Sequence, residues 1–70
     1  MKYKIDFFEI QEQTEVFRCS KEMIFYNWDN LYSWTMEHLQ TSNIWKNCNM
    51  LIKIETMPTI QQSNFFYHAE

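Results

Sequence analysis

The sequence contains no glycine, one proline and two cysteines, and each shortage excludes a class of protein. At average usage a chain of this length would hold roughly five glycines. Without glycine the chain cannot form a glycine-rich phosphate loop, a dinucleotide-binding fingerprint or a glycine-based nucleophile elbow. Two cysteines without a secretory signal are typical of reduced thiols in a cytosolic protein.

Targeting and membrane segments are also lacking. The basic residues Lys2 and Lys4 are followed by Asp6 and not by a long apolar segment, so the N-terminus has the pattern of neither a signal peptide nor a transit peptide. No apolar run approaches the roughly 18 residues that a membrane span requires. We therefore expect a cytoplasmic protein with no membrane partner, in the host cytoplasm if a phage encodes it.

Large aromatic side chains compensate for the small size of the chain. Seventy residues allow one domain, and a core of this size is usually marginal. The chain contains three Trp, four Tyr and six Phe, and aromatic side chains bury about 150–250 Å² each. We therefore expect an independently folded domain and not a disordered chain.

Three segments are predicted to be strands, and they are residues 2–10, 14–19 and 48–56. The first and third have apolar residues at every second position, and the second returns from the turn with Val16 and Phe17. If Tyr3, Ile5 and Phe7 face the helix, then Lys4, Asp6, Phe8 and Ile10 point to the open face of the sheet, where Arg18 and Lys53 join them. A turn without glycine has to use ordinary backbone angles, so we expect the loop between the first two strands to be longer than two residues.

Residues 21–40 carry the clearest helical pattern. Apolar positions recur at steps of one, three and four over four turns, and they are Ile24, Phe25, Trp28, Leu31, Tyr32, Thr35, Met36 and Leu39. Ser20 is the expected N-cap, and Asn43 is the expected left-handed residue after the helix. In an alternative that stays open, residues 23–26 belong to the second strand and the helix starts at Asn27 or Trp28 and not near Lys21.

These elements predict an α+β domain with the order ββαβ over residues 1–58. The helical crossover places the second and third strands parallel, with the first strand between them. The result is a three-stranded, mostly antiparallel sheet with one long helix packed on one face. Pro58 marks a boundary, and residues 59–70 form a C-terminal tail that packs on the open sheet face, adds an edge strand or reaches a second subunit.

No constellation of residues indicates catalysis or metal binding. His38, His68, Cys19 and Cys48 are scattered singly along the chain. No two of them have the spacing of a zinc-ligand pair, and no Ser or Cys has the partners of a catalytic triad. We therefore predict no enzyme, no metal site and no cofactor.

One side of the predicted helix carries more aromatic residues than a solvent-exposed face should. The residues on this side of the helix and directly next to it are Met23, Tyr26, Asn30, Trp34, Glu37 and His38. Trp and Tyr are enriched in interface hot spots, so we predict a partner-binding surface there. The alternative is that the tail folds over these residues, or that the helix begins later, so that they form no exposed stripe.

Acidic residues dominate two stretches of the chain, which has a formal net charge of −3. The stretch between Lys4 and Arg18 and the stretch between Lys21 and Lys46 contain no Lys or Arg. The predicted acidic surface consists of Glu9, Glu12, Glu15, Glu22 and Asp29. It is either a solvated surface or a face that meets a basic partner.

These observations predict a small non-enzymatic protein-binding module. Short acidic domains without catalytic signatures are often inhibitors encoded by phages or mobile elements. An inhibitor of a host nucleic-acid-handling complex, such as an anti-CRISPR protein acting on a CRISPR-type defence complex, has this profile. It would act by steric blocking or by presenting carboxylates to a basic groove that holds nucleic acid.

Two alternative functions stay open. A nucleic-acid-binding sheet would use Phe8, Lys4, Arg18 and Lys53, because aromatic residues among basic ones can stack on bases. A structural or assembly subunit would act through homodimerisation of its aromatic faces.

Overall fold

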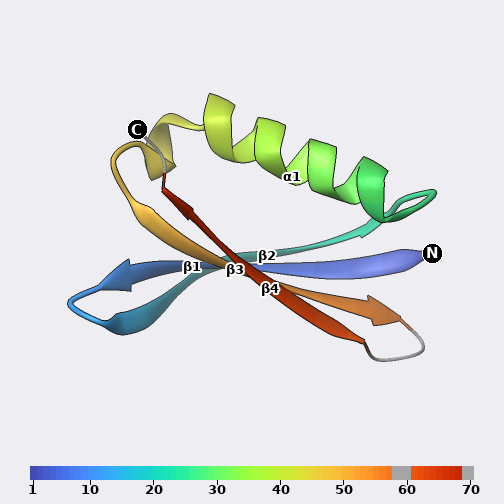
Figure 1. Ribbon diagram of the computed structural model, residues 1–70, viewed down its shortest axis with the longest axis horizontal. Coiled ribbons are helices and arrows are strands. Elements are labelled where there is room, and N and C mark those ends of the chain that lie inside the picture. Colours follow the sequence, from blue (N-terminus) through green and yellow to red (C-terminus); the bar gives the residue numbers. More distant parts are fainter. Residues whose placement is uncertain (58–60, 69–70) are drawn as a thin grey trace.

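The structure, a computed structural model, describes residues 1–57 and 61–68. A hairpin of β1 (Lys2–Gln11) and β2 (Thr14–Ile24) leads into helix α1 (Trp28–Thr41). A short 3-10 helix, η1 (Asn43–Trp45), then precedes β3 (Asn49–Met57) and β4 (Gln62–His68). Figure 1 shows α1 lying over one face of the sheet, and no described element covers the other face. The fold therefore has two layers, and one face of the sheet is open.

The strands form one sheet in the order β2-β1-β3-β4, and every neighbouring pair is antiparallel. The α+β class, the single helix on one face and the place of β1 between β2 and β3 are therefore confirmed. The expectation of three strands is wrong, because Gln62–His68 pairs with the free edge of β3. This pairing lets Phe65 and Tyr67 pack against the core. The predicted boundary at Pro58 lies outside the described residues.

The core lies between α1 and the sheet. Side chains alternate across a strand, and Tyr3, Ile5 and Phe7 point to the helix as expected, with at most 5% of their surface exposed. Leu31 and Leu39 meet them from α1, and Trp45, Met50, Ile52 and Ile54 complete the buried cluster. The residues between these positions, such as Lys4, Asp6 and Phe8, therefore lie on the open face.

Helix α1 begins at Trp28, so the later of the two predicted starts is confirmed. Met23 and Ile24 remain in β2 because they pair with Tyr3 and Lys2 of β1. The side-chain oxygen of Asn27 accepts a hydrogen bond of 2.9 Å from the backbone N–H of Asn30, so Asn27 is the N-cap. The expectation that Ser20 caps the helix is wrong, because Ser20 lies within β2.

The later start also changes which side of the helix is buried. Trp28 and Tyr32, expected in the core, are 38% and 42% exposed, whereas Trp34, expected outside it, packs against the core. The fully buried residues of α1 include the polar residue Thr35, whose hydroxyl donates a hydrogen bond of 2.9 Å to the carbonyl of Leu31. A hydroxyl that is satisfied in this way can be buried at little cost, so Thr35 lies in the core, as the helical pattern predicted.

The hairpin turn also differs from the expectation. Gln11 pairs with Thr14, so only Glu12 and Gln13 form the loop, and their φ angles are 51° and 67°. Two left-handed residues are the mark of a type I′ turn, whose twist matches that of the strands. The loop is therefore two residues long without glycine. The left-handed residue after the helix is Asn47, with a φ of 63°, and not Asn43.

Gln13→Gly should stabilise the protein. A left-handed conformation costs a non-glycine residue roughly 1–2 kcal/mol, which glycine avoids. We expect the free energy of unfolding to rise by only roughly 0.5–1 kcal/mol, because the greater conformational entropy of glycine in the unfolded chain offsets part of this gain. Urea denaturation measures this change, and Gln11→Gly, within β1, is the matched control that should lower stability. A loss of stability in Gln13→Gly would contradict the turn assignment.

Asn27→Ala should destabilise the protein because it removes the N-cap of α1. Loss of such a cap costs about 1 kcal/mol. The same substitution at Ser20, whose side chain is exposed on β2, should change the free energy of unfolding much less. Thermal or urea denaturation of both variants tests the helix start directly, and a larger effect at Ser20 would place the cap there.

Candidate binding surface

Four large apolar residues form a row across the open face of the sheet. The strand register places Phe17 of β2 opposite Phe8, Phe8 opposite Leu51, and Leu51 opposite Phe66 of β4. We call these four residues the apolar row. The rings of Phe8 and Phe17 meet edge to face with 5.5 Å between their centroids. Leu51 is only 5% exposed, whereas Phe17 and Phe66 at the two ends are 55% and 75% exposed.

A β-bulge in the hairpin places Phe17 in this row. The register of β1 and β2 shifts between Phe7 and Phe8, so that Cys19 opposes Phe7 while Phe17 opposes Phe8. Arg18 is therefore the extra residue. In an unbroken register Arg18 would oppose Phe8, and Phe17 would point to the other face. The bulge thus turns one more aromatic side chain to the open face.

The lysines of the open face are paired with carboxylates. The Nζ atom of Lys53 lies 2.8 Å from Oε1 of Glu15 and 4.6 Å from the ring centroid of Phe8. At the other end of the face, Lys2 lies 3.4 Å from Glu22, and Lys4 lies 4.0 Å from Asp6. Exposed pairs of this kind add about 0–1 kcal/mol of stability. Their main effect is that the apolar row lies in nearly neutral surroundings.

The predicted acidic surface is divided between distant parts of the molecule. Glu12 lies in the hairpin loop and Asp29 in the first turn of α1, which are at opposite ends in Figure 1. Glu9 accepts hydrogen bonds of 2.6 and 2.9 Å from the guanidinium of Arg18. Hydrogen bonds from Gln11 and Arg18 lower the pKa of the Glu9 carboxyl. Glu9, Glu15 and Glu22 are therefore already paired with cations of this chain.

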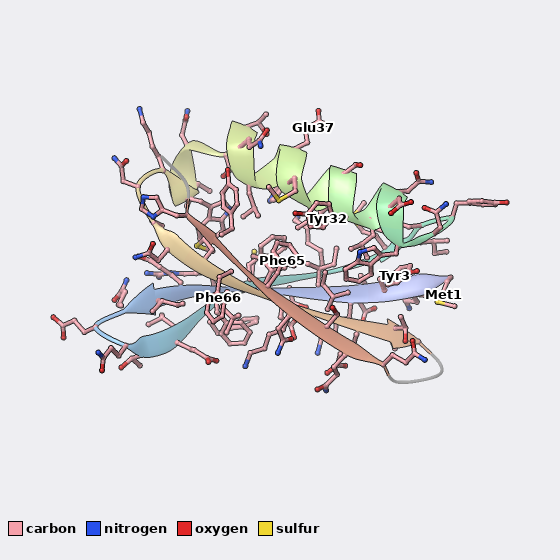
Figure 2. The ribbon with its side chains drawn as sticks, viewed as in Figure 1. Met1, Tyr3, Tyr32, Glu37, Phe65 and Phe66 are labelled. Carbon is pink, nitrogen blue, oxygen red and sulfur yellow. The ribbon has the colours of Figure 1, made fainter. Side chains whose placement is uncertain are left out.

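The predicted stripe on the helix does not form. Met23 lies in β2, and Tyr26, 88% exposed, lies in the loop before α1. Trp34 is half-buried, with its ring centroid 5.9 Å from that of Phe25 and 5.0 Å from that of His38. Glu37 points away from the sheet (Figure 2), and Asn30 lies in the first turn of α1, where its backbone N–H binds the N-cap. Partner binding through these residues stays a prediction, but it cannot use one continuous stripe.

The two cysteines lie in surroundings that disfavour the thiolate. Burial raises the pKa of the Cys19 thiol, and burial with the nearby Glu9 carboxyl raises that of Cys48. A protonated thiol is a poor nucleophile and a poor metal ligand. Among residues 1–57 and 61–68, no three His, Cys, Asp or Glu side chains lie close enough together to hold a metal ion. Within the same residues, no helix has the length and apolar character needed to cross a membrane.

The residue pattern of the chain indicates only part of the apolar row. The alternation in residues 2–10 placed Phe8 on the open face, and Lys53 beside it. Leu51 has the same parity as Lys53, so the pattern contained a signal for it. Phe17 depends on the bulge and Phe66 on the pairing of β4, and neither feature has a clear mark in the sequence.

Stability should fall in mild acid because of His38. Its ring lies 5.5 Å from that of Phe7 and stacks on Trp34, and burial, with the charge of Lys21 nearby, lowers the pKa of this imidazole below 6.5. The unfolded chain therefore takes up this proton first, so stability is full above pH 6.5 and decreases as the pH falls. His38→Gln should remove this decrease. Urea denaturation at a series of pH values measures it, and equal slopes in both proteins would refute the assignment.

Comparison of the chain with protein-family models, with curated proteins and with solved structures finds no match. Its function is therefore inferred from its own geometry alone.

Proposed function

We propose that this chain is a non-enzymatic protein-binding module and that its contact surface is the apolar row. One observation carries the proposal: Phe17 and Phe66 remain 55% and 75% exposed at the two ends of a row that no described element covers. Exposed apolar patches on small proteins mark interaction sites. Aromatic residues are also enriched in the centres of protein interfaces, where lysine and glutamate are depleted.

The electrostatics of the open face favour a protein over a nucleic acid. Nucleic-acid binding depends on cations that replace the counterions of the phosphates. The three cations in the nucleic-acid hypothesis, Lys4, Arg18 and Lys53, all lie beside carboxylates of this chain. A phosphate backbone would have to compete with these pairs and would also meet Asp6 and Glu15. The nucleic-acid alternative therefore has less support.

The partner predicted from the sequence is a host nucleic-acid-handling complex of the CRISPR type, which a phage or mobile-element inhibitor would block. This hypothesis stays a prediction. Of its two mechanisms, steric blocking has more support than acidic mimicry. The predicted carboxylates are divided between distant parts of the molecule, and Glu9, Glu15 and Glu22 each pair with a cation of this chain.

Phe17→Glu should weaken partner binding by roughly tenfold or more, because it replaces an exposed aromatic contact of the apolar row with a charge. The partner is first captured with the wild-type protein from a lysate of the native host and identified by mass spectrometry. Its affinity for each variant is then measured by calorimetry. Circular dichroism establishes that the variants fold.

The matched control is Ile44→Glu. Ile44 is 77% exposed on η1, which lies on the helix side of the sheet, where its neighbour Trp45 stacks on Phe7. This variant should bind like the wild type. The apolar row is excluded as the contact surface if Phe17→Glu keeps full affinity or if Ile44→Glu loses as much. Salt-dependent binding of single-stranded DNA by the wild type would instead support the nucleic-acid alternative.

A further inference from the structure

The two edges of the sheet differ in how they are protected. Strand β2 has a bulge and the charged residues Glu15, Arg18, Lys21 and Glu22. Strand β4, Gln62–His68, contains no Asp, Glu, Lys, Arg or Pro, and its register with β3 is unbroken from Gln62 to His68. Charges, proline and bulges are the usual means by which an edge strand avoids pairing with another chain. Strand β4 therefore lacks the protection that β2 has.

The outer side of β4 is open. Within the described residues β4 pairs only with β3, so the main-chain groups directed to its other side have no strand partner. Figure 1 views the sheet from the side of β4, and no described element passes in front of it. Main-chain N–H and C=O groups in this arrangement are a template for a further strand.

Partly exposed aromatic side chains flank this edge on both faces. Helix α1 runs alongside β4, where Trp28 lines a hollow together with Gln62 and Ser63. The ring centroid of Tyr32 lies 5.4 Å from that of Phe65 on the helix side, while Phe66 projects from the open face (Figure 2). Trp28, Tyr32 and Phe66 are 38%, 42% and 75% exposed. An added strand would therefore find apolar contacts above and below its backbone.

We infer that the added strand is β4 of a second copy of this chain. Two copies related by a two-fold axis perpendicular to the sheet would pair their β4 strands antiparallel, with both helices on the same face. Residues that oppose each other would then share a face. The register that pairs β4 over its whole length is centred on Phe65, which opposes the partner's Phe65, while Asn64 opposes the partner's Phe66.

Charge and size both favour a second copy as the occupant. With no charged Asp, Glu, Lys or Arg in β4, self-pairing brings no like charges opposite each other. A stable interface needs about 800 Å² from each partner, which is more than one strand edge supplies. The exposed surfaces of Trp28, Tyr32 and Phe66 extend the contact on both faces. Dimerisation also adds apolar burial to a 70-residue domain, whose own core is small.

The dimer goes beyond the proposed function, because Phe17 lies on β2 at the far edge of the sheet and stays accessible in it. Sedimentation velocity over a wide range of concentration should show a dimer for the wild type. The double variant Ser63→Lys/Asn64→Lys changes two exposed positions of β4 and places lysines on both faces next to the two-fold axis. It should remain folded by circular dichroism and raise the dimer dissociation constant roughly tenfold or more.

The matched control is Thr14→Lys/Ser20→Lys, which adds the same charge at exposed positions of β2 and should leave the dimer intact. Phe17→Glu should also remain dimeric, so a failure of the partner-binding proposal can be told from a failure of this one. The inference is overturned if the wild type is monomeric throughout, or if the β2 control dissociates as readily as the β4 variant. It is also overturned if Phe17→Glu alone dissociates the dimer, which would indicate packing of the two open faces.

Discussion

The pairing of β1 with a strand on each side is the constraint on which the rest of the structure depends. All ten residues of β1 pair with β2, and Lys2–Glu9 pair with β3 as well. A strand held on both sides cannot slip, because a shift of one residue would move every inward side chain to the other face. Tyr3, Ile5 and Phe7 are thereby committed to the helix side.

The same pairing decides where the helix begins. Residues 21–24 have apolar positions that suit a helix, but in this chain they complete the ladder along β1. Strand β2 therefore ends only at Ile24, and α1, which begins at Trp28, covers one face of the sheet. The other face keeps its outward residues, and the charges among them are largely neutralised by one another.

The sequence predicted those features that depend on alternation in a single segment. The inward residues of β1 and the third strand follow from apolar residues at every second position. The place of β1 between β2 and β3 follows from the crossover rule. The helix start was ambiguous because Met23, Ile24 and Phe25 fit both a strand and a helical face. Thr35 was placed correctly only because it fits the helical period, whereas Trp28 and Tyr32 were misplaced by the assumed start.

Other features arise only from tertiary structure. Glu12 and Gln13 adopt left-handed angles because the twisted strands require a tight turn there. Residues 62–64 are polar and show no strand pattern, and they become part of β4 because the edge of β3 is available. The candidate surface depends on both kinds of feature, so its central residues were predictable and its two ends were not.

The bulge at Arg18 gives the hairpin one position at which chain length can vary. Deleting Arg18 would remove only the extra residue, because Cys19 and Phe17 would become neighbours and would still oppose Phe7 and Phe8 in an unbroken ladder. Every side chain of β2 would then keep its face, Phe17 included. Related chains should therefore differ in length more readily at this position than elsewhere in β2.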